Sequence, residues 1–247
     1  MTTETPGAPK RGEALREVAE DAIGFGAAEL RLTRDLLRRP RAVMDVYDAH
    51  GSTAGGLYPR PLRYWATING LYLLLTALAG GLERSLQVSQ SGATREDLEW
   101  LAGRAGKTVE EFSADLEQWM SLVMLPLYAL IFGGALFLLF RKWSPADDRQ
   151  DFNQTFTFLN AWTLWTLPFG LVSMFLLSND LMMLLSVAVM FLSIPIVYAV
   201  FGRGRWWRTR TGAVAKGAVL VLVSFLAFVP LSILAGGLSL AGAFFLP

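Results

Sequence analysis

The chain has 247 residues, of which 53% are hydrophobic and 17% are charged, and its formal net charge is +1. Soluble domains carry about 25% charged residues, so this composition argues against a water-soluble protein with a large core. The balanced charge gives no reason to expect nucleic acid as a partner. The lack of cysteine excludes disulfides, thiol catalysis and cysteine-ligated metal centres.

The N-terminal segment carries many charges and lacks the apolar core of a secretory signal. Residues 13–39 are predicted to form an amphipathic helix that ends at Pro40, because apolar residues recur there at three- and four-residue spacing. Arginines at its end suit a helix that lies on an anionic membrane surface, and the alternative is a helix packed on the protein. We expect residues 1–63 to form a cytoplasmic N-terminal region.

Five apolar runs follow, and each is close to the roughly 20 residues that a helix needs to cross the hydrocarbon of a bilayer. They cover residues 64–82, 119–140, 156–178, 181–201 and 213–235. None alternates with the period of two that marks a membrane β-barrel. The sequence therefore predicts an all-α, polytopic membrane bundle of five transmembrane helices over residues 64–247.

The distribution of positive charge predicts how these runs are oriented, because cytoplasmic loops are rich in Lys and Arg. Ten such residues precede the first run, 4 lie in 83–118, 3 in 141–155, none in 179–180 and 5 in 202–216. The segment 83–118 also carries eight acidic residues, for a net charge of −4. The alternation predicts a cytoplasmic N-terminus and a periplasmic C-terminus in the bacterial inner membrane.

The exterior segment between the first two runs carries two signals for the start of a helix. Thr94 with Asp97, and Thr108 with Glu111, have the spacing of a capping box. We expect a small helical hairpin over 93–118 whose second helix runs into the second span. It would serve either as a docking site for a partner or as a solvated cap.

Cations and amphipathic aromatic residues at the ends of the runs are typical of membrane-interface anchors. The predicted anchors are Arg60, Arg63, Trp65, Arg141, Lys142, Trp143, Arg205, Trp206 and Trp207. Prolines lie inside four runs, at Pro126, Pro168, Pro195 and Pro230. Each is expected to kink its helix. Kinked helices shape a bundle and, in some transporters, line a binding site.

The third run begins with a polar stripe. Asn153, Thr157 and Asn160 are spaced i, i+4 and i+7, and Thr163 follows one turn later. Such a stripe faces neighbouring helices rather than lipid. Its side chains would either join helices by hydrogen bonds or line a polar cavity for a headgroup or a small solute.

Candidate chemistry is sparse. The five runs contain essentially no ionisable residue, which argues against a proton-driven transporter. A metal site at His50 with Asp45 and Asp48 is conceivable, although a single histidine is more often an ordinary polar residue. No known catalytic or nucleotide-binding motif is present. We therefore predict no catalytic, cofactor-binding or metal-ligating residues.

Three segments resemble a family of bacterial membrane proteins of unknown function. They are 38–65, with its YPRPLRYW end, 125–142, with LPLYALIFGGALFLLFRK, and 152–162, with FNQTFTFLNAW. Many members of that family carry a Cys-rich zinc-binding segment before the membrane part, which this cysteine-free chain lacks. The five-span plan is also similar to the Yip family of membrane-trafficking adaptors, a resemblance of architecture that implies no catalytic residues.

These observations lead us to expect a non-enzymatic scaffold or accessory subunit of a larger membrane complex. Its partners would be membrane lipids and other membrane protein subunits, without a cofactor. The alternative is a carrier of lipid or a small neutral solute that uses the kinked helices and the polar stripe.

Overall fold

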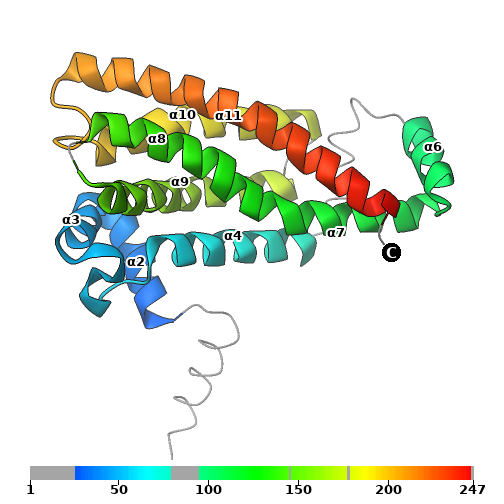
Figure 1. The fold of residues 1–247 in the computed structure, drawn as a ribbon, viewed down its shortest axis with the longest axis horizontal. Helices are drawn as coiled ribbons and strands as arrows, with labels where there is room; N and C mark the ends of the chain where they lie inside the picture. The colour runs from blue at the N-terminus through cyan, green and yellow to red at the C-terminus, as the bar shows by residue number, and fades with distance from the viewer. Residues whose placement is uncertain (1–25, 79–94, 145, 177–178, 246–247) are drawn as a thin grey trace, which may run out of the picture.

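A computed structural model describes residues 26–78, 95–144, 146–176 and 179–245. The described residues are almost entirely helical, which confirms the predicted all-α class for this part of the chain (Figure 1). The helices are α2 (Ala27–Arg38), α3 (Pro40–His50), the 3₁₀-helical η1 (Gly51–Gly56), α4 (Pro61–Leu78), α6 (Arg95–Ala105), α7 (Val109–Leu127), the π-helical η2 (Tyr128–Gly133), α8 (Gly134–Trp143), α9 (Asp148–Leu176), α10 (Asn179–Phe201) and α11 (Arg210–Phe245).

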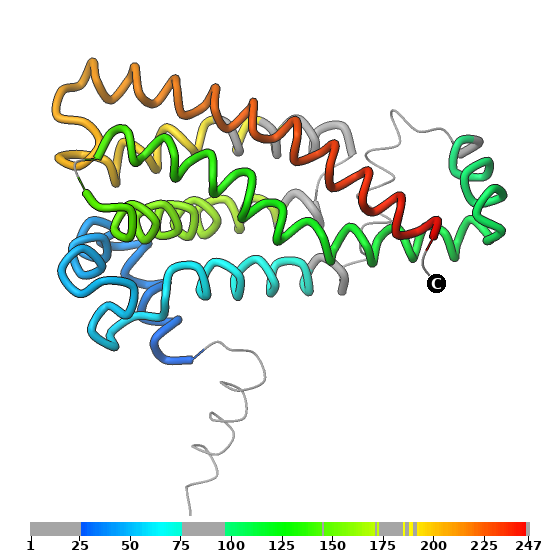
Figure 2. Tube along the Cα trace, viewed as in Figure 1, coloured from blue at the N-terminus to red at the C-terminus, as the bar shows by residue number. Residues whose placement is uncertain are grey.

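The long helices lie side by side, with the short ones gathered at the two ends of the bundle (Figure 2). Helices α2 and α3 lie at one end, near the turn that joins α10 to α11, whereas α6 lies at the other end beside the end of α11. Within the described residues, two helical stretches are long and apolar enough to cross a membrane, namely Val109–Trp143 and Arg210–Phe245.

The predicted N-terminal helix ends where expected, because α2 ends at Arg38 with Arg39 as its C-cap, directly before Pro40. The prediction did not include α3, of which Pro40 is the first residue. The first turn of a helix tolerates proline, since its missing N–H has no partner there in any case. Leu32 and Leu36 of α2 are fully buried and belong to the main hydrophobic core, so residues 27–38 pack on the protein. The earlier part of the predicted helix, 13–25, lies outside the described residues.

The hairpin before the second span has the predicted features in its described part. Thr108 and Glu111 form the expected capping box, in which Glu111 N–H donates to Thr108 Oγ1 and Thr108 N–H donates to Glu111 Oε2. Helix α7 continues from this cap into the apolar run, as expected. The proposed cap at Thr94 lies outside the described residues.

All four prolines of the apolar runs lie inside helices. Pro126 is followed two residues later by the π-helical turn Tyr128–Gly133. A proline removes one backbone hydrogen bond, and a wider turn accommodates the carbonyl that is left free. The path of the chain changes direction between α7 and α8 (Figure 2). Pro168, Pro195 and Pro230 have regular α-helical residues around them.

Helices α7 and α11 form the most extensive helix pair of the bundle. Gly242 lies against the indole ring of Trp119, and a Cβ built at this glycine would fall 2.3 Å from that ring. Beside this contact, Lys107 Nζ donates to the carbonyl of Ala243 at 2.8 Å and pairs with Asp115 at 2.7 Å. A lysine at the C-terminal end of a helix binds carbonyls that lack partners there. The apolar tail after residue 235 thus continues the fifth helix to Phe245.

Candidate functional site

The polar stripe predicted for the third run lies on α9 and faces the interior of the protein. Asn153, Thr157 and Asn160 are each at most 3% exposed. Thr157 Oγ1 donates to the carbonyl of Asn153 in its own helix at 2.7 Å. Asn160 Nδ2 donates to the carbonyl of Pro61 at 2.9 Å, which joins α9 to the start of α4. This last bond is a contact of the kind that the helix-packing interpretation predicts.

Not every polar atom of this buried stretch has a partner. Asn153 Nδ2, Gln154 Oε1 and Asn160 Oδ1 make no hydrogen bond within the described part of the chain. Burying an amide group without a partner costs about 1–3 kcal/mol. These atoms are buried, and none of their residues lines the cavity described below.

The stripe changes character beyond Asn160, where Thr163 and Thr166 line a cavity of about 360 Å³. Helices α4, α7, α9 and α10 and the first residue of η2 form its wall. The lining residues are Asn69, Tyr72, Leu73, Met124, Leu125, Tyr128, Trp162, Thr163, Thr166, Leu167, Phe169, Gly170, Leu185 and Val189. The described lining is mainly apolar and contains no charged side chain.

Some polar groups in the wall are already occupied. Thr166 Oγ1 donates to the carbonyl of Trp162 at 2.9 Å, and Trp162 Nε1 donates to Ser193 Oγ at 2.7 Å. By contrast, the hydroxyl groups of Tyr128 and Thr163 form no hydrogen bond among the described residues, and Asn69 uses only its Nδ2, toward the carbonyl of Trp65. The wall therefore offers two hydroxyls and an amide oxygen to a bound molecule.

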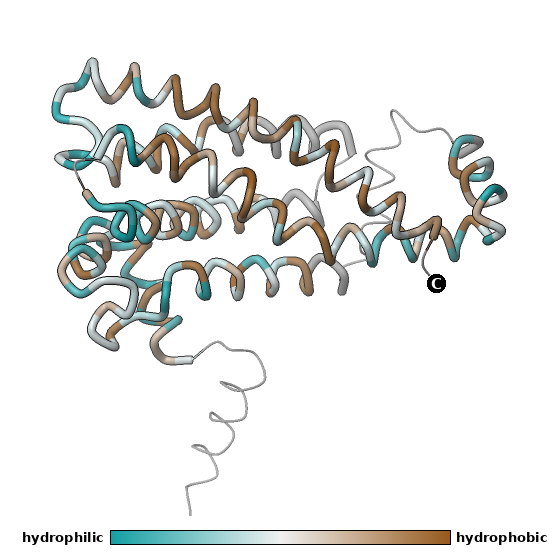
Figure 3. The backbone as a smooth tube through the Cα atoms, viewed as in Figure 1, coloured by the Kyte–Doolittle hydropathy of each residue, from teal (hydrophilic) through white to brown (hydrophobic). Residues whose placement is uncertain are grey.

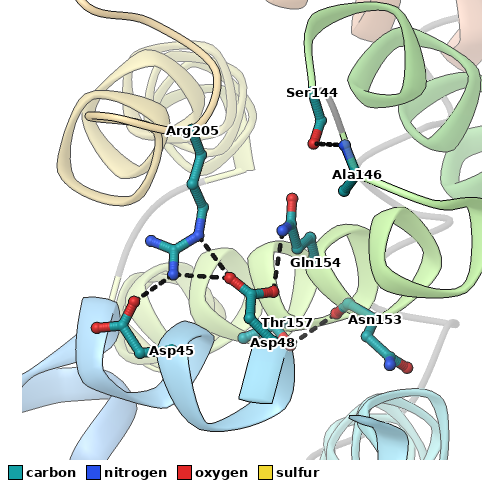
Figure 4. Close-up of polar contacts among 8 residues, drawn as sticks. All are labelled: Asp45, Asp48, Ser144, Ala146, Asn153, Gln154, Thr157 and Arg205. Carbon is teal, nitrogen blue, oxygen red and sulfur yellow. Dashed lines mark hydrogen bonds and ion pairs between the residues drawn. The ribbon is translucent and has the colours of Figure 1, made fainter.

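A second polar centre joins α3 to the turn between α10 and α11 (Figure 4). Arg205 donates to Asp48 Oδ2 through Nε at 3.0 Å and through Nη2 at 2.8 Å. The same Nη2 pairs with Asp45. Gln154 Nε2 of α9 donates to the other oxygen of Asp48 at 3.0 Å. One guanidinium and one amide thus hold three segments together.

Several predicted interface anchors are buried in protein. The side chain of Arg205 is 16% exposed, and Trp65 and Trp206 are each 1% exposed. Trp65 stacks on Tyr128 at a ring distance of 5.6 Å, and Trp206 stacks on Phe140 at 4.0 Å. Trp65 and Trp206 are therefore buried in the protein and Arg205 is half-buried in its ion pairs, and contact of these three residues with lipid headgroups stays a prediction.

The remaining predicted anchors lie nearer the surface. Trp143 and Trp207 are half-buried, and Lys216 Nζ lies over the Trp143 ring at 5.2 Å while it donates to the carbonyl of Trp206. The other four anchors are exposed cations: Arg60, Arg63, Arg141 and Lys142. Two of these form ion pairs, Arg63 with the buried Glu29 at 3.5 Å and Arg141 with the exposed Asp148 at 2.9 Å.

Two buried carboxylates at this end of the bundle have opposite surroundings. The Arg34 guanidinium donates to Asp35 at 3.0 Å and lowers the pKa of that carboxyl, as does the Tyr58 hydroxyl at 2.9 Å. Asp151 is 0% exposed, and the Ser144 hydroxyl, which lowers the pKa of this carboxyl, does not offset the effect of its burial. Burial therefore raises the pKa of Asp151, because the charged form loses its hydration.

The conceivable metal site at His50 does not form around the two neighbouring aspartates, because Asp45 and Asp48 bind Arg205 instead. His50 itself is exposed. Across the described ranges, no group of three or more His, Cys, Asp or Glu side chains is arranged to hold a metal ion.

Sequence reasoning did not identify Asn69, Tyr128 or the Arg205–Asp48 pair as site residues. Asn69 was detectable, because it is a polar residue within the first apolar run, where a membrane-embedded amide usually has a specific role. Tyr128 had no such signal, because tyrosine is common in apolar helices. The pairing of Arg205 with Asp48 depends on segments 157 residues apart, and the sequence alone does not bring them together.

The fold and site together define an all-helical protein with a polar, ion-paired end and an uncharged cavity between four helices. Comparison with protein-family models, with curated proteins and with solved structures finds no match to this chain. The resemblances noted in the sequence therefore stay predictions, and the functional argument depends on the chain itself.

Proposed function

We propose that this chain is a five-span protein of the bacterial inner membrane that acts by binding rather than by catalysis. In this proposal it holds or carries a lipid or a small neutral solute of the bilayer. The distribution of hydropathy supports a membrane location, because polar residues gather at the two ends of the bundle and apolar residues occupy the stretch between them (Figure 3). Helices α4, α9 and α10 lie alongside the two longest apolar helices and would supply the other three spans.

The proposed orientation places the end with α2 and α3 in the cytoplasm. That end carries exposed cations of several segments, including Arg141, Lys142, Arg203 and Arg208. The opposite end carries the acidic first turn of α7, with Glu110 and Glu111. This separation of charge agrees with the rule that positive residues remain on the cytoplasmic side.

Single-cysteine labelling would test this topology without background, because the chain contains no cysteine. In intact spheroplasts, a membrane-impermeant maleimide should label Gly103→Cys on α6 and should label Arg203→Cys only after lysis. Labelling of both positions, or of Arg203→Cys alone, before lysis would contradict the proposed five-span orientation.

The cavity is the observation that carries the proposed function. Its wall combines apolar side chains with a few hydrogen-bonding groups, which is the usual composition of a small-molecule site. It lies among α4, α7, α9 and α10, within the apolar belt, so molecules dissolved in the bilayer would be its natural ligands. The exposed rim residue Phe169, at 52%, indicates that the cavity is close to the outer surface of the bundle.

A cavity-filling substitution would test whether the site binds a molecule of the bilayer. Val189→Trp places a large ring in the cavity, whereas Leu192→Trp places the same ring on the exposed face of the same helix, where Leu192 is 65% exposed. After extraction in a mild detergent, native mass spectrometry should detect a retained lipid-sized molecule on the wild type and on Leu192→Trp. Equal retention by Val189→Trp would overturn the proposal.

A role as an accessory subunit is the second candidate, and the surface of α6 favours it. Trp100 is 59% exposed at the proposed periplasmic end, and the Arg104 guanidinium lies 4.9 Å from its ring centre. Exposed Trp and Arg side chains are enriched in protein interfaces. A photoreactive residue at position 100 should crosslink to a specific membrane protein, whereas one at Leu222, on the apolar face of α11, should crosslink mainly to lipid.

A further inference from the structure

We infer that the ligand of the cavity is an uncharged lipid with a free hydroxyl group, held by Asn69, Tyr128 and Thr163. The inference depends on the proposed function, since it names the chemical class of the molecule that the cavity would hold. Three properties of the cavity support it: its lack of charge, its uncommitted hydrogen-bonding groups and its size.

Charge is the first property. None of the described residues that line the cavity is acidic or basic. A charged headgroup in this part of the bilayer would lose its hydration without gaining an opposite charge, which is strongly unfavourable. The basic residues lie at the α2–α3 end of the molecule, so anionic headgroups would find their partners there instead. The cavity therefore selects against phospholipid headgroups.

Hydrogen bonding is the second property. Tyr128 and Thr163 each present a hydroxyl without a partner in the described chain, and Asn69 presents an amide oxygen. A hydroxyl group on the ligand both donates and accepts, so it can satisfy the Asn69 oxygen and one of the two protein hydroxyls together. A hydrocarbon or a fully esterified lipid cannot donate to Asn69 and would leave this oxygen without a partner.

Two neighbouring aromatic rings hold the side chain of Tyr128 in position. Its ring stacks on Trp65 at 5.6 Å and on Phe132 at 5.0 Å, which fixes the direction of its hydroxyl. It is also the first residue of the π-helical turn that follows Pro126. π-Helical turns occur frequently at functional sites, because they redirect side chains along a helix.

Size is the third property. A volume of about 360 Å³ is near the lower end of the range of about 300–1,000 Å³ that holds drug-sized ligands. It accommodates a glycerol backbone and the first carbons of its chains, and it is too small for two complete acyl chains. The remaining hydrocarbon would extend past the exposed rim at Phe169 into the bilayer, where it needs no protein contact.

Three lipids that all carry oleoyl chains would test the ligand class on the 247-residue chain. Nanodiscs of phosphatidylcholine would be supplemented with diacylglycerol, phosphatidic acid or triacylglycerol, and ligand retention after mild extraction would be measured by native mass spectrometry. Diacylglycerol has the free hydroxyl and no charge, phosphatidic acid has the charge, and triacylglycerol has neither. We expect saturable retention of one diacylglycerol per chain and at least about tenfold weaker retention of the other two.

Conservative substitutions would locate the interaction. Tyr128→Phe combined with Thr163→Val keeps the shape of the wall and removes both hydroxyls, and it should weaken diacylglycerol retention by about tenfold. The matched control is Tyr198→Phe, which removes a hydroxyl that likewise has no partner among the described residues but lies outside the cavity, at the α2–α3 end. This control should retain diacylglycerol as the wild type does.

The outcomes separate this inference from the proposed function. If the wild type retains phosphatidic acid or triacylglycerol as strongly as diacylglycerol, and Val189→Trp abolishes that retention, the ligand class is wrong but the cavity still binds lipid. If Val189→Trp has no effect on any probe, the proposed function itself fails. The probe comparison needs only wild-type protein, so it remains decisive even if the double variant does not fold.

Discussion

Between Asp151 and Asn160, the polar side chains of α9 are buried, and several of them join the helix to α3 and α4. Between Trp162 and Gly170, the same helix presents polar side chains to a cavity, and at least one hydroxyl there has no partner in the described chain. Polar residues in one apolar helix can therefore have different surroundings and different roles along its length. In the first half, Gln154 and Asn160 join α9 to other helices by hydrogen bonds, whereas in the second half the hydroxyl of Thr163 lines the cavity and bonds to no described residue.

The largest expected effect concerns the ion-paired end. Arg205→Met would leave the carboxylate of Asp48, which is 20% exposed, without its cation, and should lower the free energy of unfolding by about 3 kcal/mol. The measurement is the free energy of unfolding of the protein in detergent. Arg203→Met removes an exposed cation from the same turn and should change stability by less than about 0.5 kcal/mol.

A double variant sharpens this test. Adding Asp48→Asn to Arg205→Met removes the uncompensated charge, so it should restore part of the lost stability. If Arg205→Met is no more harmful than Arg203→Met, the guanidinium does not hold α3 to the turn, and the first half of α9 depends less on its polar partners than we argue.

Asn160→Ala is expected to have the next largest effect. It removes the bond to the Pro61 carbonyl in a fully packed environment and should cost about 2 kcal/mol. The matched substitution in the cavity wall is Asn69→Ala, whose amide nitrogen bonds only within its own helix, and it should cost less than about 1 kcal/mol. Similar losses for the two variants would remove the distinction between the packed and the ligand-facing parts.

Asp151→Asn should act in the opposite direction and raise stability at neutral pH by about 1 kcal/mol, because it removes a buried charge whose loss of hydration the Ser144 hydroxyl does not offset. Since burial raises the pKa of Asp151 in the folded state, the folded chain holds its proton longer than the unfolded chain. Stability from this group is therefore lost as the pH rises from the unfolded pKa through the folded one.

The measurement is the melting temperature of the two proteins across a pH series from mildly acidic to neutral. The wild type should lose stability with rising pH relative to Asp151→Asn. The opposite slope would indicate that a cation or a hydrogen-bond donor compensates the carboxylate. Asp35, whose pKa is lowered mainly by Arg34, should contribute the reverse dependence, with stability lost as the pH falls.

The smallest expected effect on stability is that of Thr163→Val, at less than about 0.5 kcal/mol, because its hydroxyl bonds to no described residue. Thermal unfolding of the ligand-free protein would measure it. A loss as large as that of Asn160→Ala would show that Thr163 belongs to the packed part of the helix, and the cavity would then lose one of its binding groups.

Local patterns in the sequence predicted the helices well. The capping box at Thr108 depends on residues three apart, and the apolar runs depend on composition over about 20 residues, so both are visible without tertiary information. The beginning of α3 was missed because Pro40 stops a helix in one position and starts it in another, and only the backbone decides between the two. The continuation of α11 to Phe245 was missed because its final turns have a partner, Lys107, that lies far away in the chain.

The site was less predictable than the fold. The i, i+4, i+7 pattern from Asn153 to Asn160 defines one face of a helix, and the three residues on it are buried. The pattern did not reveal that Thr163 faces different neighbours from Asn160. Arg205 and Trp206 were interpreted as residues facing headgroups, because arginine and tryptophan are common there. Their burial depends on contacts between segments that are far apart in the chain, and composition does not reveal such contacts.

The pairing of α7 with α11 has a consequence for the biogenesis of the protein. Helix α7 is synthesised well before α11. The contact between Trp119 and Gly242 therefore cannot form until α8, α9 and α10 have been synthesised. The face of α7 that packs on α11 in the folded protein stays uncovered during that interval. The hydrogen bond from Lys107 to the Ala243 carbonyl near the end of α11 can form only after that helix has been synthesised.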